Sequence, residues 1–236
     1  MRLLGEAGCD SPVSVTPRNG PPPAAPTAGA LPPLPGPSTL RQDGRVTTPS
    51  RPRRPDVTTL ELVGGPERVE VSLHEHDERW PARYLEHRAR ILDALRASGG
   101  PVGVHHIGST SVPGLAAKPI VDVLVVVDDV TAEEDHVEPL LAAGYVLRVR
   151  EPGHRLVRTP ERDAHVHVFE EGHPAIDEYF LLRDHLRADA ADRELYASTK
   201  RALLAQPWDD MNDYADAKTA VIAAITERAR AARAAR

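Results

Sequence analysis

The feature that most constrains this chain is a near-continuous apolar run at residues 119–127, PIVDVLVVV, which one acidic residue interrupts. Its length and its β-branched residues are typical of a strand that is buried on both faces. The interruption is Asp122. Because an unpaired carboxylate in a protein interior is strongly unfavourable, we expect Asp122 to pair with a cation, to bind a metal ion or to face a cleft.

The first 55 residues differ in composition from the rest of the chain. They hold 13 of the 23 prolines but no aromatic residue, histidine or lysine. A segment with little apolar surface to bury does not offset the conformational entropy that folding costs. We therefore predict a disordered proline-rich tail at residues 1–55, followed by a single domain at residues 56–236. The tail is open to three interpretations: a flexible linker, a ligand for a partner that binds PxxP segments, or an extension upstream of the true start codon.

The charge of the predicted domain argues against general nucleic-acid binding. The formal net charge is −6, and seven arginines against three acids in the tail leave about −10 for residues 56–236. General nucleic-acid binders usually carry a basic face, although a few backbone amides and one lysine suffice for a local nucleotide site. The single cysteine, Cys9, excludes an intrachain disulfide. No apolar run approaches the length of a membrane span, so we expect a cytoplasmic protein without membrane contact.

Hydrophobic periodicity and turn residues predict the order of the secondary structure. Strands are expected at residues 69–73, 102–107, 119–127, 145–149, 155–159 and 165–169. Helices are expected at residues 74–98, 131–143, 175–187, 192–205 and 209–233, with one helical turn at residues 111–117. Thr131 and Glu134 have the spacing of a capping box, and Gly144 is placed to end that helix. This order predicts an α+β fold, in which a mixed β-sheet has flanking helices and the C-terminal half is helical.

Residues 106–125 join a Gly-Ser loop, a lysine and the interrupted strand in one string, HIGSTSVPGLAAKPIVDVLV. This string resembles the signature of the GrpB family, which is similar in fold to the nucleotidyltransferases. Further elements that resemble the family lie before and after this string, and together they span about residues 68–226. They are a tryptophan-containing helix at residues 77–86, a histidine-containing strand at residues 164–169, the string RDHLR at residues 183–187, and Tyr196, Lys200, Tyr214 and Lys218.

The resemblance implies a phosphate-binding loop next to a metal site. Nucleotidyltransferases of this fold carry a Gly-Ser loop at a helix start, two acids separated by one residue on the next strand, and a third acid on a later strand. Backbone amides of such a loop bind phosphate, and the acids hold metal ions that position a nucleoside triphosphate. The resemblance thus implies phosphate binding by Gly108, Ser109, Thr110 and Ser111, and catalysis with metal binding by Asp122.

The chain departs from the nucleotidyltransferase pattern at the second acid, where it has Leu124. Residues 122 and 124 share one face of a strand, and a leucine does not bind a metal ion. His165 and His167 alternate onto one face of their own strand, where the third acid is expected, although such a pair is often a half-exposed strand face. We predict that His165 and His167 bind a divalent metal (Mg, Mn or Zn) together with Asp122, and that His167 also acts in catalysis.

Three basic residues are candidates for binding the phosphate of a ligand. Lys118 precedes the buried strand, Arg183 can hold phosphate with its planar guanidinium, and Lys218 is one helical turn from Tyr214, with which it would cap the cleft. In the alternative interpretation the two lysines are solvated and Arg183 is the buried partner of Asp122.

Two classes of function remain for the predicted site. The first is a nucleotidyltransferase-like enzyme, which binds a nucleotide or a phosphorylated metabolite and transfers a nucleotidyl group to an unknown acceptor. The second is a non-catalytic ligand-binding or regulatory module with a degenerate transferase site, as Leu124 suggests. Both predict a small-molecule or nucleotide ligand. In a weaker third hypothesis, the proline-rich tail binds a protein partner.

Overall fold

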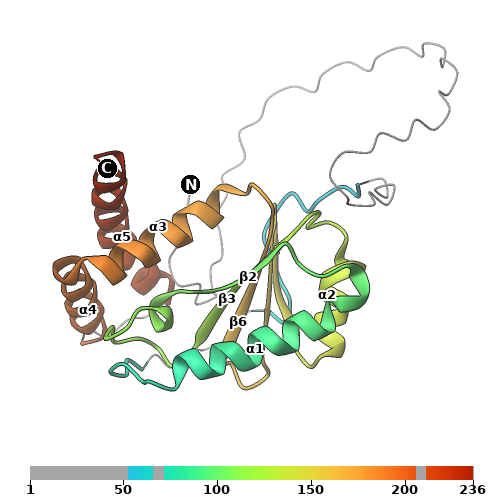
Figure 1. Ribbon diagram of the computed structural model, residues 1–236, viewed down its shortest axis with the longest axis horizontal. Coiled ribbons are helices and arrows are strands. Elements are labelled where there is room, and N and C mark those ends of the chain that lie inside the picture. Colours follow the sequence, from blue (N-terminus) through green and yellow to red (C-terminus); the bar gives the residue numbers. More distant parts are fainter. Residues whose placement is uncertain (1–52, 66–71, 206–210, 236) are drawn as a thin grey trace, which may run out of the picture. The chain divides into compact units, whose positions relative to one another are not determined.

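The computed structural model describes residues 53–65, 72–205 and 211–235, which form strands and helices in the order shown in Figure 1. The strands are β1 (Glu61–Leu62), β2 (Gly103–Ile107), β3 (Val121–Val127), β4 (Val146–Glu151), β5 (His154–Arg158) and β6 (Ala164–Glu170). The helices are α1 (Trp80–Ala94), α2 (Glu133–Ala142), α3 (Pro174–Ala188), α4 (Ala190–Leu204) and α5 (Met211–Ala234), with single 3₁₀ turns at η1 (Arg96–Ser98) and η2 (Ser109–Ser111). The α+β class is therefore confirmed.

The six strands form one mixed sheet in the order β1-β4-β5-β6-β3-β2. Strands β3 and β6 are parallel, and every other neighbouring pair is antiparallel. The predicted meander of β4, β5 and β6 is confirmed, as is the buried strand β3, whose seven residues are all buried. The parallel β3–β6 pair places Asp122 directly opposite His165. This register brings together two parts of the predicted site that are far apart in the sequence.

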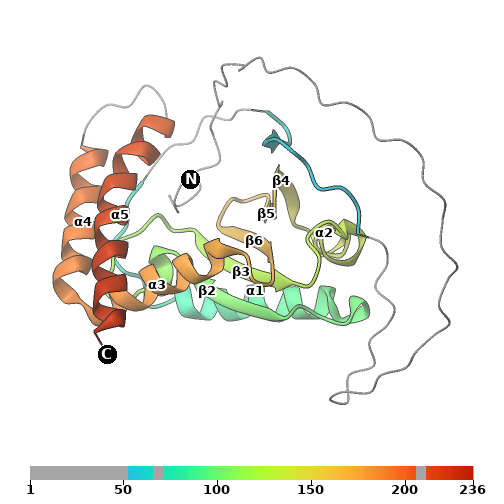
Figure 2. The same cartoon turned by 90° about the horizontal axis from the view of Figure 1, so that it is seen from above.

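The helices cover the two faces of the sheet separately. Helices α1 and α2 pack on one face, where their apolar residues meet alternate residues of β3 in the main core. Helix α3 packs on the other face, against a smaller cluster that includes Leu124 and Phe169. Asp122 is in phase with Leu124, so it lies on the α3 face. Helices α4 and α5 lie side by side (Figure 2), and a third apolar cluster joins them to α3 and to the segment after η2.

Helix α1 begins at Trp80, later than the predicted start at residue 74. Pro81 in the first turn favours this start, because proline lacks the amide hydrogen that a residue deeper in a helix would donate. The preceding residues are used differently: His74 forms an isolated bridge with Ala117, and the amide of Trp80 donates to the carbonyl of Asp77 in a turn. The predicted strand at residues 69–73 lies largely outside the described residues, and its last two residues are not in a strand.

Two local predictions next to helices are wrong. Helix α2 begins at Glu133 after Ala132 and has no side-chain cap, and the hydroxyl of Thr131, the predicted cap, donates to Asp129 (2.6 Å). The predicted helical turn at residues 111–117 is instead η2, which ends at Ser111 before an extended residue. The predicted helix end at Gly144 is confirmed, since this glycine follows α2 with a φ of 91°.

Residues 1–52 of the predicted tail lie outside the described residues. Arg53 and Arg54, which were also assigned to the tail, form ion pairs with Glu170 (2.6 Å) and Glu134 (2.8 Å) of the folded part. The tail boundary thus stays a prediction. None of the helices in the described residues combines the length and apolar character that a membrane span requires.

Candidate functional site

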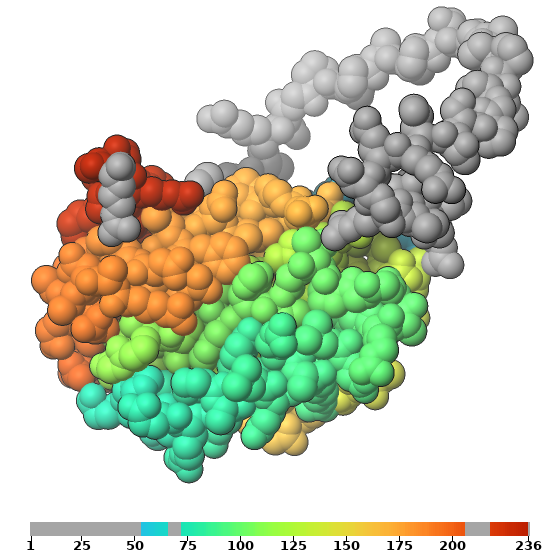
Figure 3. Space-filling view, viewed as in Figure 1, coloured from blue at the N-terminus to red at the C-terminus, as the bar shows by residue number. Residues whose placement is uncertain are grey.

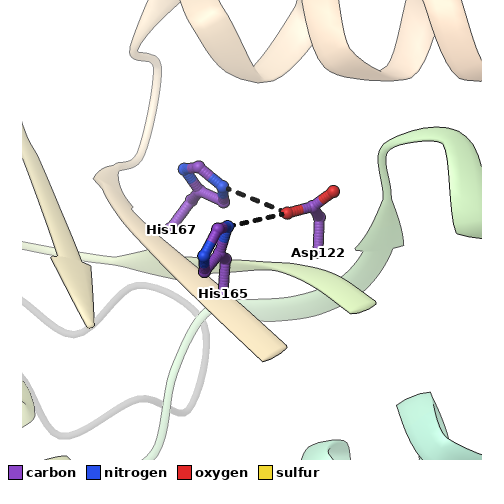
Figure 4. Close-up of side chains that lie close together, drawn as sticks. All are labelled: Asp122, His165 and His167. Carbon is purple, nitrogen blue, oxygen red and sulfur yellow. Dashed lines mark ion pairs between the residues drawn. The ribbon is translucent and has the colours of Figure 1, made fainter. Parts of the chain in front are cut away.

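Asp122 lies next to two histidines of the parallel neighbouring strand (Figure 4). Its Oδ1 is 3.5 Å from Nδ1 of His165 and 3.7 Å from Nε2 of His167. All three residues are buried, and one ligand atom from each lies within 4.8 Å of the other two. The predicted metal-binding residues are therefore brought together by the register of β3 and β6.

The two histidines keep the Asp122 carboxylate ionised. Burial alone would raise the pKa of Asp122, but the neighbouring side chains of His165 and His167 outweigh this effect and hold the pKa well below its usual range. The described partners of Asp122 are these histidines, whereas Arg183 pairs with Asp184. The alternative in which Arg183 is the buried partner of Asp122 is therefore wrong.

A cavity of about 30 Å³ lies between this cluster and the helices. One water needs roughly 10–15 Å³ on this measure, so the cavity has room for about two waters, which suffices for a phosphate oxygen or a metal ion but not for a whole nucleotide. Figure 3 shows the orange surface of α3 and α4 closely apposed to the green surface of the segment from β2 towards β3. The cavity is lined by Gly108, Ser109, Val112, Asp122, His167, Tyr179, Leu182, Arg183, Leu186 and Tyr196.

Gly108 brings the loop backbone into direct contact with the acid. Its φ of 68° and ψ of −176° are a combination that essentially only glycine adopts. A Cβ atom at this position would lie 2.3 Å from Oδ2 of Asp122, closer than any real contact allows. The glycine is therefore needed both for its backbone conformation and for the approach of the loop to the carboxylate.

The side chains of the Gly-Ser loop are mostly engaged in the loop itself. Thr110 is hydrogen-bonded to His106 (3.1 Å), and the hydroxyl of Ser111 donates to the carbonyl of Gly108 (2.6 Å). Neither Thr110 nor Ser111 lines the cavity. Of the four predicted phosphate-binding residues, Gly108 and Ser109 are thus the two that face it.

The buried ammonium group of Lys200 lies behind the loop. It donates to the hydroxyl of Ser109 (2.9 Å) and to the carbonyl of Ala116 (2.6 Å), and it lies 4.5 Å from the centroid of the Tyr196 ring. Lys200 is 1% exposed. It therefore places a positive charge next to Ser109, which favours an anion in the adjoining cavity.

The three predicted basic residues have different positions. Arg183 lines the cavity, and its guanidinium donates to Asp184 (2.7 Å) and to the carbonyl of His106 (3.2 Å). Lys118 is half-buried just before β3, and Lys218 is fully buried in α5; neither lines the cavity. The side chain of Tyr214 lies outside the described residues. The structure thus brings only Arg183 of these residues to Asp122 and His167.

Two residues that the sequence interpretation did not select belong to the same neighbourhood. Tyr179 of α3 lines the cavity, and burial, with the nearby Asp122, raises its pKa well above the usual value, so its hydroxyl keeps its proton. His154 of β5 is hydrogen-bonded to Nδ1 of His167 (3.2 Å) on the side away from Asp122. In the sequence, Tyr179 resembles an ordinary core residue of an amphipathic helix and His154 follows a turn, so neither carries a local signal.

The donor set at Asp122 fits a divalent metal ion. Two imidazoles and a carboxylate are typical ligands of zinc, manganese or iron, whereas magnesium prefers oxygen ligands. The second ring nitrogen of His167 is held by His154, as is usual for histidines that bind metals. The residues that would hold the ion are Asp122, His165 and His167, and Leu124 is fully buried among apolar side chains instead of contributing a second acid.

The family model described as GrpB protein matches residues 70–228 of this chain. The chain belongs to the GrpB family. A UPF0157 protein of Streptomyces coelicolor is 66% identical over 188 residues, which cover 80% of this chain and 100% of that protein. The crystal structure of GrpB from Enterococcus faecalis has a TM-score of 0.59 and 30% identity, and the match covers 67% of this chain and 96% of that one. The family resemblance of the sequence is therefore confirmed.

Two more distant matches cover less than half of the matched proteins. Cid1 in complex with a UTP analog aligns with a TM-score of 0.37 and 18% identity over 54% of this chain and 41% of that one; a likeness of this size carries no argument about activity. A dephospho-CoA kinase of Mycolicibacterium paratuberculosis is 30% identical over 182 residues, or 64% of this chain and 44% of the kinase. A region similar to this family thus occurs as part of a longer enzyme.

Proposed function

We propose that the protein binds a divalent metal ion at Asp122, His165 and His167, and that the phosphate of a nucleotide or phosphorylated metabolite enters the adjoining cavity. The observation that carries this proposal is the shared cavity: Asp122, His167, Arg183 and the Gly108–Ser109 backbone all line it. These groups supply a metal site, a guanidinium and a glycine loop, which are the parts that phosphate recognition needs. The small cavity leaves the rest of the ligand outside, over the cavity mouth.

The proposed reaction is attack of an acceptor hydroxyl on the α-phosphorus of a nucleoside triphosphate: a new P–O bond forms to the acceptor, the bond to the β-phosphate breaks, and pyrophosphate leaves with the hydroxyl proton. A bound metal ion would neutralise phosphate charge and polarise the phosphorus centre. Arg183 would bind a non-bridging phosphate oxygen, and the hydroxyl of Tyr179 would donate a hydrogen bond to another. Asp122 and His167 would hold the reacting groups in place, and the apolar residues of α3 would exclude water from the cavity.

The test is ligand-induced thermal stabilisation with Zn²⁺, Mn²⁺ and Mg²⁺, each with and without the four nucleoside triphosphates. We expect Zn²⁺ or Mn²⁺ to raise the melting temperature, a triphosphate to raise it further, and Asp122→Asn to remove both effects while the protein still folds. Asp192→Asn is the matched control, because Asp192 is also a buried acid paired with a histidine, but it lies outside this cavity. Absence of stabilisation by every metal and triphosphate, or its loss in the control alone, would contradict the proposal.

Leu124 favours a second candidate function, a ligand-binding module without catalysis. This leucine occupies the position of the second acid and is fully buried, so one metal-binding carboxylate of the nucleotidyltransferase pattern is absent from β3. A region similar to this chain within a dephospho-CoA kinase is consistent with a supporting role. Binding of a triphosphate or of coenzyme A without any nucleotidylated product, measured by mass spectrometry, would support this second function over the first.

A further inference from the structure

A hydrogen-bonded series of three side chains leads from the protein surface to the metal site. It consists of Glu151, His154 and His167, and we call it the Glu-His-His series. Oε1 of Glu151 is 2.6 Å from Nδ1 of His154, and Nε2 of His154 is 3.2 Å from Nδ1 of His167. Nε2 of His167 then faces Asp122 at 3.7 Å. Each histidine thus uses both ring nitrogens, one towards the surface and one towards the cavity.

The fold holds this series rigidly. Glu151 ends β4 and His154 begins β5, on the two sides of a tight turn, while His167 lies in the middle of β6. The ring planes of His154 and His167 are nearly parallel, with centroids 5.3 Å apart, and Phe169 stacks on His154 with a centroid distance of 4.2 Å. His154 is 5% exposed and His167 is 2% exposed, whereas the side chain of Glu151 is 44% exposed.

The hydrogen bonds determine where the ring protons lie. A carboxylate can only accept, so Nδ1 of His154 carries a hydrogen and donates it to Glu151. His154 is buried and packs against the ring of Phe169, and burial disfavours the charged form of a histidine, so the ring is neutral and its Nε2 is an acceptor. Nδ1 of His167 must therefore be the donor in the bond between the two histidines. This leaves Nε2 of His167 as the nitrogen that the ring presents to Asp122 and the cavity.

We infer that Glu151 and His154 are positioning residues, which keep the proton of His167 on Nδ1 and thereby present its Nε2 to the metal site. The part of this inference that concerns metal affinity rests on the proposed function. The orientation of His167 does not, because it follows from the Glu-His-His series alone. A ligand histidine held in one tautomer and one orientation loses less freedom when the ion binds.

The tautomer is measured directly by ¹⁵N NMR of the histidine rings in the metal-free protein, with His167 assigned by comparison with His167→Gln. We expect Nδ1 of His167 to be protonated in the natural protein, and this preference to be lost in His154→Phe. Phenylalanine keeps a flat ring stacked on Phe169 but offers His167 no acceptor. A bare Nδ1 in the natural protein, or an unchanged His167 spectrum in His154→Phe, would overturn the inference.

The effect on the metal site is measured by Co²⁺ titration, followed by calorimetry and by visible absorption. We expect His154→Phe to weaken Co²⁺ binding about 10- to 100-fold, the usual effect of removing a group that orients a ligand. Glu151→Gln keeps a side-chain acceptor and should stay within about threefold of the natural protein, whereas Glu151→Leu should resemble His154→Phe. Phe169→Leu is the control for stacking, because it removes the ring stacked on His154 and leaves the series intact.

The outcomes separate the inference from the proposed function. If the natural protein does not bind Co²⁺, the proposed metal site fails, and the NMR result still decides the inference. If the natural protein binds Co²⁺ and both His154→Phe and Glu151→Leu bind it equally well, the inference fails and the metal site stands. If His154→Phe does not fold, Glu151→Leu decides, because Glu151 is half-exposed and leaves the stacked rings in place.

Discussion

Substitution of Gly108 by alanine tests the contact between the loop backbone and Asp122. The φ and ψ of Gly108 belong to a region that costs other residues about 1–3 kcal/mol. The added methyl carbon would lie 2.3 Å from Oδ2 and 3.0 Å from Cβ of Asp122, an overpacked contact that costs about 1–3 kcal/mol more. We therefore expect Gly108→Ala to lower the free energy of unfolding by about 2–6 kcal/mol, measured by urea denaturation.

Two controls separate the cost of the backbone conformation from the cost of the contact with Asp122. Gly114 also has a positive φ, 75°, but a methyl group there would meet nothing within 4 Å, so Gly114→Ala should cost only about 1–2 kcal/mol. In an Asp122→Ala background the carboxylate is absent, and Gly108→Ala should cost less than in the natural protein. If Gly108→Ala costs no more than Gly114→Ala, and the same in both backgrounds, the reasoning about this contact is refuted.

Two further predictions concern protonation and the buried ammonium group. Burial lowers the pKa of His106 and His154 to about 4, below the usual 6.5, so their protonation opposes folding. The free energy of unfolding should have its full value above pH 6.5 and should fall by roughly 3 kcal/mol per histidine as the pH decreases to about 4. A free energy of unfolding that does not change over this range would contradict the prediction. Lys200→Met removes the donor to Ser109 and Ala116 but keeps the apolar stem, and should cost about 1–3 kcal/mol in urea denaturation and weaken triphosphate binding. Unchanged binding would show that Lys200 has a structural role alone.

Most elements of the fold were predictable because their signals are local. The apolar run of β3, the glycine that ends α2 and the turns between β4, β5 and β6 all lie within a few residues of the structure they determine. The predictions failed where another contact competed with the local sequence signal. Thr131 has the sequence of a helix cap, yet its hydroxyl is bonded to Asp129. Residues 74–79 have helical periodicity, yet His74 pairs with Ala117.

The site was predictable as far as local patterns and the family resemblance reached. Asp122 was selected because it interrupts an apolar strand and His165 and His167 because they share a strand face, and the register of β3 and β6 brings them together. His154 could not be selected, because its contact with His167 depends on the antiparallel register of β5 and β6. Lys218 was selected as a ligand-binding residue, but the packing of α5 buries its side chain away from the cavity.

The short strand β1 separates the boundary of the family from the boundary of the folding unit. The family match begins at residue 70, yet β1 and Asp56 precede it. Strand β1 pairs with β4, which would otherwise be an open edge of the sheet, and Asp56 pairs with the buried Arg155 (2.7 Å). A protein trimmed to the family match would expose an edge prone to intermolecular strand pairing and would leave a buried arginine with one acidic partner fewer. Aggregation of such a trimmed protein would then reflect the loss of β1 and Asp56 rather than an intrinsic instability of the GrpB core.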